Sequence, residues 1–449
     1  MKSDLDRLMA DRNIDALLAL GPAANNPVMT YMCNGAHVGE HTALVKKRGE
    51  PPVMIVASME RDEAAKSGLR VIEWSRYDPV KTLNEEQGNR LRATVRNYQA
   101  IFADLGVHGA VALYGLQEQG KTMALAYEFN VRANGAHLVG EFDHTVFDAA
   151  FTTKDAAEVE RIRAVGAKTV AVIGNTAEFL QSHRAASGVL VKNDAAPLTI
   201  GDVKREIRRW EVELNLEDAS GPIFAIGRDA GVPHSRGEDA DPIALGKSII
   251  YDIFPSEPGG GYYFDITRTW CMGFAPPEIE KAYEETRAVF DIIVAEMQMN
   301  DLCRPHQQRV CDLFEAQGHV TLKTDRKTTK GYTHSLGHGV GLNIHEAPHF
   351  SDFEGNLDRI DPGCVVTIEP GLYYPDDGGY GVRVEDCVWM NPATAQFETL
   401  ANFPKDLVLP VKQAATRKAR GAKRPAVAGR SRPKTKSRSS TAKPKRRSP

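Results

Sequence analysis

Closely paired cysteines are absent from this chain of 449 residues, whose six cysteines lie scattered between Cys33 and Cys387. A cysteine-type structural zinc site is therefore not expected, and neither is a disulfide framework in a chain this long. The chain also lacks any run of eighteen apolar residues, so we expect no membrane-spanning helix. Charged residues within the first twelve positions leave no apolar core for a signal peptide. We therefore expect a protein of the reducing cytoplasm.

Acidic residues are missing from the C-terminal segment 411–449, which carries fifteen Lys and Arg and no Phe, Tyr, Trp, Leu or Ile. Residues 1–410 carry the other 41 basic residues against 59 acidic ones, a balance of −18 behind the overall −3. A segment so poor in apolar side chains cannot offset the entropy of ordering, which predicts a disordered tail. Its charge predicts non-specific, salt-dependent contact with polyanions. Folding back on the acidic body and a purely solubilising role are the alternatives.

The chain as a whole has the composition of a soluble globular protein, with 42% hydrophobic and 26% charged residues, and its length allows two or three domains. Short apolar runs at 14–20, 42–47 and 52–57 predict strands. Between and after them we predict helices over 58–66, about 84–105 and 118–133. Residues 1–150 are thus predicted to form a small α/β domain.

After a joint at 151–154, the pattern changes from alternating helices and strands to helices followed by strands. Helices are predicted over 155–181, 202–214, 276–297 and 304–320, with a strand pair between 248 and 272. From 331 to about 390 the chain is rich in glycine and strand-like. This order predicts an α+β domain over 151–410.

Three histidines and three glycines gather in residues 332–348, YTHSLGHGVGLNIHEAP. His334, His338 and His345 follow the pattern H-x3-H-x6-H. Glycine at alternate positions disfavours a helix and allows close approach of another group to the backbone. We interpret the segment as strand and loop that direct imidazole rings into a cleft.

Four carboxylates stand at the ends of, or within, apolar strand-like runs: Asp252, Asp265, Glu369 and Glu385. Burying a carboxylate is costly unless it is paired or bound to metal. Four carboxylates and an imidazole form a hard donor set suited to Mn(II), Fe(II), Co(II) or Zn(II). Because four negative charges exceed what one divalent ion neutralises, two ions with bridging carboxylates fit better. Such a pair can hold a bridging hydroxide and polarise a carbonyl, as amide hydrolysis requires.

The flanks of these residues resemble those of the M24 metallopeptidases of pita-bread fold, a family that includes methionine aminopeptidase, aminopeptidase P and prolidase. The matching stretches cover about 155–410 and include Asp265-Ile-Thr-Arg-Thr, GHGVGLNIHE, Glu369-Pro-Gly and Gly-Val-Arg-Val-Glu385. Residues 1–150 resemble the creatinase-type N-terminal domain of aminopeptidase P and prolidase. The resemblance implies an α+β pita-bread domain over 151–410 after that smaller domain, in a homodimer with a peptide substrate and two divalent ions, Mn(II) first among them.

The resemblance also implies roles for individual residues. Asp252 would bind one ion, Asp265 and Glu385 would bridge both, and His338 and Glu369 would complete the other site. Glu369 would in addition act as general base toward the bridging water.

Four further residues would serve the substrate. His234 would contact it, and His345 would stabilise the tetrahedral oxyanion or the leaving nitrogen. His334 would line the pocket, and Arg383 would support the metal ligands or contact the substrate carboxylate.

One departure from the family pattern concerns the hairpin between the two aspartates. They are thirteen positions apart instead of the usual eleven, and Asp252-Ile-Phe replaces D-x-G. We predict that the hairpin lengthens at its tip and keeps the strand register, so that the pocket rim changes and the ligands do not.

The function implied is that of a dinuclear exopeptidase that hydrolyses an N-terminal Xaa-Pro bond in peptides or dipeptides. One alternative is a hydrolase or lyase of this fold that acts on a non-peptide small molecule. Another is a non-catalytic scaffold that binds peptides or polyanions. Loss of ligands would mark the scaffold, and all five are present.

Overall fold

The computed structural model describes residues 2–132 and 135–413, beginning with a mixed six-stranded sheet in the order β4-β3-β2-β1-β5-β6. Its strands are β1 Ala16–Leu20, β2 Ala43–Lys47, β3 Val53–Val56, β4 Arg70–Glu73, β5 Gly109–Gly115 and β6 Ala136–Val139. Strand β2 runs antiparallel to β1 and β3, and the other neighbours are parallel. The strands predicted at 14–20, 42–47 and 52–57 are therefore confirmed.

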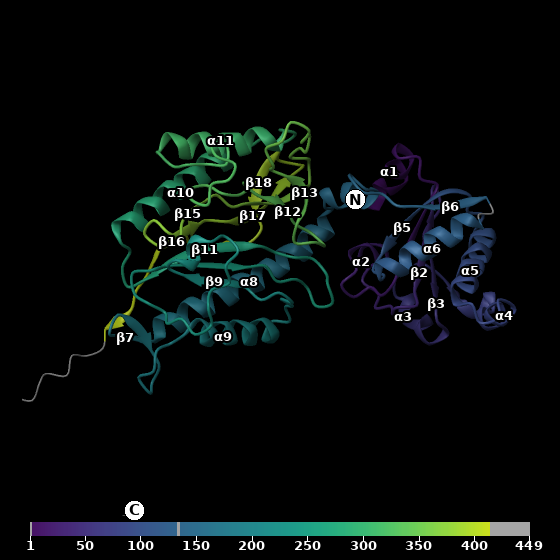
Figure 1. Ribbon diagram of the computed structural model, residues 1–449, viewed down its shortest axis with the longest axis horizontal. Coiled ribbons are helices and arrows are strands. Elements are labelled where there is room, and N and C mark those ends of the chain that lie inside the picture. The colour runs from purple at the N-terminus through teal and green to yellow at the C-terminus, as the bar shows by residue number, and fades with distance from the viewer. Residues whose placement is uncertain (1, 133–134, 414–449) are drawn as a thin grey trace, which may run out of the picture. The chain divides into compact units, whose positions relative to one another are not determined.

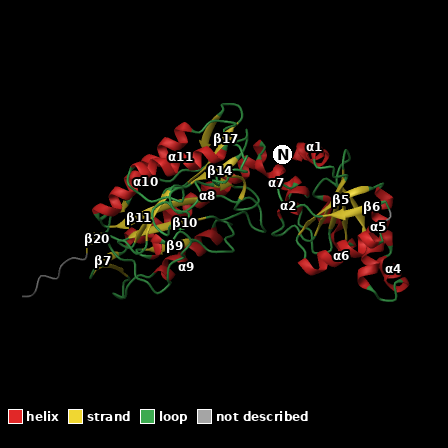
Figure 2. Cartoon of the chain, turned by 45° about the horizontal axis from the view of Figure 1, so that its top comes forward, coloured by secondary structure: helices red, strands yellow, loops and turns green. Residues whose placement is uncertain are grey.

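Both faces of this sheet are covered by helices, which explains why β1 is apolar throughout. Ala16, Leu18 and Leu20 pack with α5 Arg90–Leu105 and α6 Gln119–Val131, which Figure 2 shows beside β5 and β6. Leu17 and Ala19 point the other way, into a core shared with α1 Leu5–Asp11, α2 Pro27–Met32, α3 Arg61–Ala65 and α7 Val146–Thr152. Successive residues of a strand face opposite sides, so a strand covered on both faces is apolar at every position.

The single helix predicted over about 84–105 is wrong. The structure has α4 Pro79–Glu85, a turn, and then α5. Gln87 and Gly88 in that turn have φ of 53° and 80°, values that no right-handed helix contains. The Asn89 side chain then accepts a hydrogen bond from the backbone N–H of Arg92 and caps α5.

The joint predicted at 151–154 is confirmed only in part, because residues 151 and 152 end helix α7 and only 153–155 connect it to the next helix. Thr153 forms a bridge with Cys364, and the Lys154 amide donates to the Gly363 carbonyl at 2.9 Å. Asp155 and Glu158 then make a capping box that starts α8 Ala156–Ser182. The following helix, α9 Ile200–Glu213, confirms the predicted helix over 202–214.

The strands of the second half lie between two pairs of helices, α8 with α9 and α10 Pro277–Glu296 with α11 Cys303–Ala316 (Figure 1). One sheet has the order β19-β11-β10-β9 and comprises β9 Ile223–Ile226, β10 Ser248–Ile253, β11 Ile266–Met272 and β19 Val408–Leu409. The other has the order β13-β12-β14-β17-β18, built from β12 His338–Gly339, β13 Glu346–His349, β14 Val365–Ile368, β17 Asp386–Asn391 and β18 Gln396–Thr399. A two-stranded ribbon, β15 Gly371–Tyr374 with β16 Tyr380–Arg383, accompanies them. The predicted order of helices followed by strands is thus observed.

Order continues three residues into the segment predicted to be a disordered tail. Strand β20 Lys412–Gln413 pairs in parallel with β7 Arg184–Ala186, which also pairs with β8 Val189–Val191. The ordered chain therefore extends past the predicted boundary at 410, because backbone pairing with β7 orders residues 412 and 413. The rest of the tail, Ala414–Pro449, lies outside the described residues. No helix within 2–132 or 135–413 has the length and apolar character needed to cross a membrane.

The domain boundary at residue 150 stays a prediction. Within the described ranges, the strands of the six-stranded sheet pair only with one another.

Candidate metal centre

The five predicted metal ligands come from strand ends of both sheets in the second half of the chain. Asp252 lies in β10, and Asp265 directly precedes β11. His338 lies in β12, Glu369 directly follows β14, and Glu385 separates β16 from β17. Side chains more than a hundred residues apart in sequence thereby meet in one buried cluster.

The hairpin between the two aspartates keeps its register, as predicted. Strands β10 and β11 pair without interruption from Ser248 with Cys271 to Ile253 with Ile266. Asp252 therefore stands opposite Thr267, and Asp265 lies next to the Ile253–Ile266 pair, on its loop side. The additional residues of the hairpin fall in the loop, where a longer connection leaves both ligands in place.

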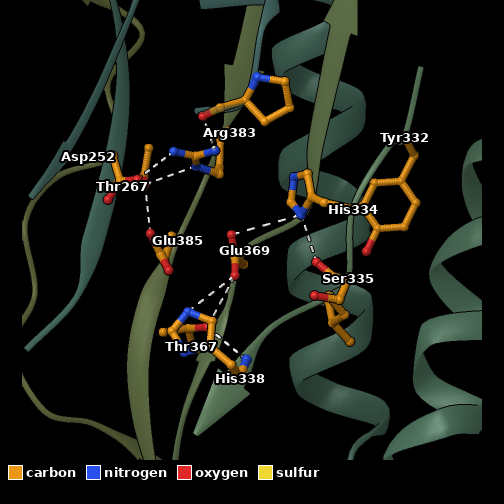
Figure 3. Close-up of polar contacts among 12 residues, drawn as sticks. Asp252, Thr267, Tyr332, His334, Ser335, His338, Thr367, Glu369, Arg383 and Glu385 are labelled. Atoms are coloured by element: carbon orange, nitrogen blue, oxygen red, sulfur yellow. Dashed lines mark hydrogen bonds and ion pairs between the residues drawn. The ribbon is translucent and has the colours of Figure 1, made fainter. Parts of the chain in front are cut away.

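Three donor atoms form the centre of the cluster. Asp265, His338 and Glu385 each offer one ligand atom, and these atoms lie within 4.8 Å of one another. The His338 Nε2 atom is 3.7 Å from Asp265 Oδ2 and 3.6 Å from Glu369 Oε1. His338 Nδ1 is 3.1 Å from the Gly339 carbonyl, which can only accept a hydrogen bond. The ring proton is therefore on Nδ1, and the lone pair of Nε2 faces the carboxylates (Figure 3).

Hydrogen bonds from an arginine and two threonines orient the carboxylates. Arg383 Nη2 donates to Asp252 Oδ2 at 2.6 Å, and Arg383 Nε donates to Thr267 Oγ1 at 3.1 Å. The Thr267 hydroxyl then donates to Glu385 Oε2 at 2.6 Å, and the Thr367 hydroxyl reaches Glu369 Oε1 at 3.5 Å (Figure 3). Sequence reasoning missed both threonines, although the register identifies Thr267 as the residue opposite Asp252.

The electrostatics of the cluster oppose ionisation of three of its carboxylates. Burial first, and then the charges of Glu385 and Asp252, raise the pKa of Asp265 well above its usual range. Burial and then Glu369 raise the pKa of Glu385 in the same way. Burial raises the pKa of Glu369 to about 8 and lowers the pKa of His338 to about 3. The imidazole is therefore neutral, the form that binds metal.

Two buried oxygen atoms indicate whether the cluster fits divalent ions. Asp252 Oδ1 and Asp265 Oδ1 have no hydrogen-bond partner among the described residues. A buried carboxylate oxygen without a partner carries a desolvation cost that a bound cation relieves. Together with a neutral imidazole aimed at the same space, these orphaned oxygens fit divalent ions.

A cavity of about 240 Å³ opens onto this cluster. Its lining includes six of the predicted site residues, namely His234, His334, His338, His345, Glu369 and Arg383. The other three, Asp252, Asp265 and Glu385, are at most 8% exposed and are not part of the lining. Sequence reasoning missed the lining residues Ser335, His349 and Ser351. Glu369 is therefore the one predicted ligand carboxylate that also faces the cavity.

His334 and Arg383 are joined through a tyrosine that the sequence did not single out. His334 Nδ1 lies 2.7 Å from the Ser335 carbonyl and carries the ring proton, so its Nε2 accepts from the Tyr373 hydroxyl at 2.8 Å. Tyr373 in turn accepts from Arg383 Nη1 at 3.0 Å. All three guanidinium nitrogens of Arg383 thus have protein partners, and its side chain is 3% exposed. These contacts favour its predicted role in supporting the ligands over direct contact with a substrate.

Comparison with known proteins identifies the family to which the chain belongs. The model of metallopeptidase family M24 matches residues 160–392, more than half of the chain and all five predicted ligand positions. The chain belongs to metallopeptidase family M24. This M24 protein is accordingly a hydrolase of the peptidase class, and the predicted placement in the aminopeptidase P and prolidase branch is confirmed.

Several relatives of the M24 protein cover only part of it. A putative dipeptidase of Bacillus subtilis is 32% identical over 206 residues, which are 44% of this chain and 51% of that protein. An Xaa-Pro dipeptidase of Pyrococcus furiosus is 31% identical over 201 residues, 42% of this chain and 52% of that protein. The M24 protein therefore matches about half the length of these two relatives.

Other comparisons extend into the N-terminal region. A probable dipeptidase of Mycobacterium tuberculosis is 27% identical over 380 residues, 82% of this chain and 85% of that protein. The crystal structure of an X-Pro aminopeptidase from Thermotoga maritima superposes with a TM-score of 0.69 at 19% identity, covering 90% of this chain and all of that one. At this identity the likeness concerns the fold alone. It confirms the predicted pita-bread architecture preceded by a smaller α/β region.

Proposed function

We propose that this M24 peptidase hydrolyses the bond between an N-terminal residue and proline, in dipeptides or longer peptides, with two divalent ions, Mn(II) first among the candidates. The observation that carries the proposal is the cluster of four carboxylates, three of them buried, and a neutral imidazole at a histidine-lined cavity. Relatives named as Xaa-Pro dipeptidase and X-Pro aminopeptidase support the choice of bond. We further propose a cytoplasmic homodimer, whose subunit number light scattering would test.

Asp252, Asp265, His338, Glu369 and Glu385 would hold the ions. When bound, the ions supply Lewis acidity toward the scissile carbonyl and lower the pKa of water. Glu369 faces both the cluster and the cavity, so it can accept a proton from the attacking water. The proline nitrogen must gain a proton in order to leave as an amine, and Glu369 can pass on to it the proton taken from the water.

Imidazole rings of the cavity wall would bind the substrate. His345 packs edge-on against the His338 ring with centroids 4.3 Å apart, so it stands next to the reacting carbonyl in our proposal. In that position it can donate to the developing oxyanion or to the leaving nitrogen. His234 lines the same cavity and would contact the substrate. His334, held by Tyr373 and Ser335, would form a fixed wall of the pocket.

Hydrolysis of peptides by the metal-loaded protein tests the proposed function. We expect release of the N-terminal residue from X-Pro or X-Pro-Y peptides, and much slower release from matched X-Ala peptides. Quantifying the free amino acid by chromatography measures both. The proposal fails if the metal-loaded protein cleaves none of these peptides, or if a folded His338→Ala variant cleaves them as fast as the unaltered protein.

Deleting 414–449 should leave small-peptide turnover almost unchanged and weaken retention on DNA or RNA. This segment carries fourteen Lys and Arg and no acidic residue, so its attraction to phosphates should fall as salt rises. Cutting after Gln413 preserves the pairing of β20 with β7. Retention on immobilised nucleic acid between low and high salt is the measurement. The control keeps the length but replaces the fourteen basic residues with serine, and it should lose retention equally. A large loss of turnover on deletion would instead make the tail part of the active site.

A further inference from the structure

A buried ion pair lies beneath the loop that carries His345, and the proposed mechanism does not use it. Lys154 Nζ is 3.0 Å from Glu346 Oε2, and the two side chains are 2% and 3% exposed. Removing two charges from water usually costs as much as their attraction returns, so such a pair adds little to stability. A role in fixing geometry accounts better for its presence.

Glu346 closes the turn between β12 and β13, directly after His345. Its Oε1 atom accepts from the Asn343 amide at 2.8 Å, while its Oε2 atom faces Lys154. The turn packs directly on this pair, because a Cβ atom added at Gly341 would overlap Glu346 Oε2 and approach Lys154 Cε at 2.8 Å. The carboxylate thus ties the backbone of the turn to a lysine 192 residues away.

Lys154 itself stands on fixed backbone. Its amide donates to the Gly363 carbonyl at 2.9 Å, and Asp155 next to it caps α8. The backbone from which the lysine side chain extends is therefore held in place independently of the turn. Movement of Glu346 away from it would shift His345, whose ring rests against the ring of His338.

We propose that Lys154 is a positioning residue which, through Glu346, holds His345 at the reacting end of the cavity. The inference rests on the proposed function, because His345 matters there as the group next to the oxyanion or leaving nitrogen. Lys154 touches neither substrate nor metal in this scheme. Its loss should therefore lower kcat and leave KM nearly unchanged, since the misplaced group acts in the transition state.

A double-mutant cycle between Lys154 and His345 tests the inference. Lys154→Met should lower kcat about a hundredfold, the effect expected of a small misplacement of a catalytic group. In a His345→Ala background the same change should cost less than about twofold, because the group that Lys154 positions is gone. Equal losses in the two backgrounds would overturn the inference.

The matched control is Lys192→Met, which removes the lysine of an ion pair with Asp202 at 3.1 Å. Lys192 directly follows β8, Asp202 lies in α9, and neither residue lines the cavity. It should leave kcat unchanged. If Lys154→Met does not fold, the double variant Lys154→Met with Glu346→Gln takes its place in the cycle, because it leaves no unpaired buried charge. A loss of kcat that disappears in the His345→Ala background supports the inference, and an equal loss in both backgrounds overturns it.

A measurement without catalysis separates this inference from the proposed function. In the metal-free protein, the ¹⁵N and ¹H resonances of the His345 ring should shift in Lys154→Met and stay unchanged in Lys192→Met. Unshifted His345 resonances in Lys154→Met would overturn the inference whatever the substrate. Failure of the unaltered protein to cleave any Xaa-Pro peptide would overturn the proposed function and leave the ring measurement to decide the positioning role.

Discussion

Glu369→Gln should lower kcat about 10³- to 10⁴-fold, because the amide cannot accept the proton of the attacking water. The substitution keeps the shape of the side chain, and Thr367 can still donate to the remaining oxygen. We therefore expect an unchanged fold and a smaller change in KM than in kcat. Steady-state kinetics on an X-Pro peptide, with circular dichroism and metal analysis on the same sample, measures the effect.

The matched control for this substitution is Glu354→Gln, the same chemical change at an exposed position between β13 and β14. It should retain full turnover. Near-normal turnover of Glu369→Gln, with metal content equal to that of the unaltered protein, would remove Glu369 as the general base.

Asp265→Asn should abolish most of the metal binding and, with it, turnover. Asp265 is 4% exposed, and its Oδ1 atom has no partner among the described residues, so its charge is balanced chiefly when a cation is present. We expect mass spectrometry of the purified protein to find about two divalent ions per unaltered chain and fewer than one per variant chain. Chelation of the unaltered protein should reduce turnover to the same background, and Mn(II) should restore it.

The role of Asp265 in metal binding can also be measured without substrate, from the Tm of thermal unfolding. A bound ion at a hundred times its Kd stabilises the folded state by about 2.7 kcal/mol, so chelation should lower the Tm of the unaltered protein. Asp265→Asn should respond little to chelation. In the metal-free state it should unfold at a higher temperature than the unaltered protein, because burial and the charges of Glu385 and Asp252 disfavour an ionised Asp265.

The control here is Asp406→Asn at an exposed position before β19, which should keep both its metal content and its Tm shift. An Asp265→Asn protein that retains two ions, or that responds fully to chelation, would contradict the assignment of Asp265 as a bridging ligand.

The sequence predicted the site residues whose burial costs free energy unless they are paired or bind metal. Carboxylates inside apolar strands are rare because burial penalises them, so Asp252, Asp265, Glu369 and Glu385 stood out without any structure. Thr267 and Tyr373 did not, since a hydroxyl within a strand is ordinary and gains its role only from the partner across the sheet. Thr267 meets Glu385 118 residues away, and Tyr373 meets His334 39 residues away. One sequence does not specify such pairings.

The fold followed a similar rule. Long periodic segments such as α8 were predictable because one face is apolar at helical spacing. The short strands β7, β8 and β20 were not, because two or three residues carry no detectable period. The turn between α4 and α5 was also missed, as positive φ at Gln87 and Gly88 leaves only a weak mark in the sequence.

The longer hairpin between Asp252 and Asp265 has an energetic consequence. Closing a loop costs entropy that grows only with the logarithm of its length, so two additional residues add about 0.2 kcal/mol, less than the thermal energy RT. Six paired residues on each strand hold the register, and the loop is tied down at its tip by Glu257, whose carboxylate accepts from Arg161 Nε at 2.9 Å. The hairpin loop can therefore vary in length almost without thermodynamic penalty, while the positions of the two aspartates stay under strong constraint.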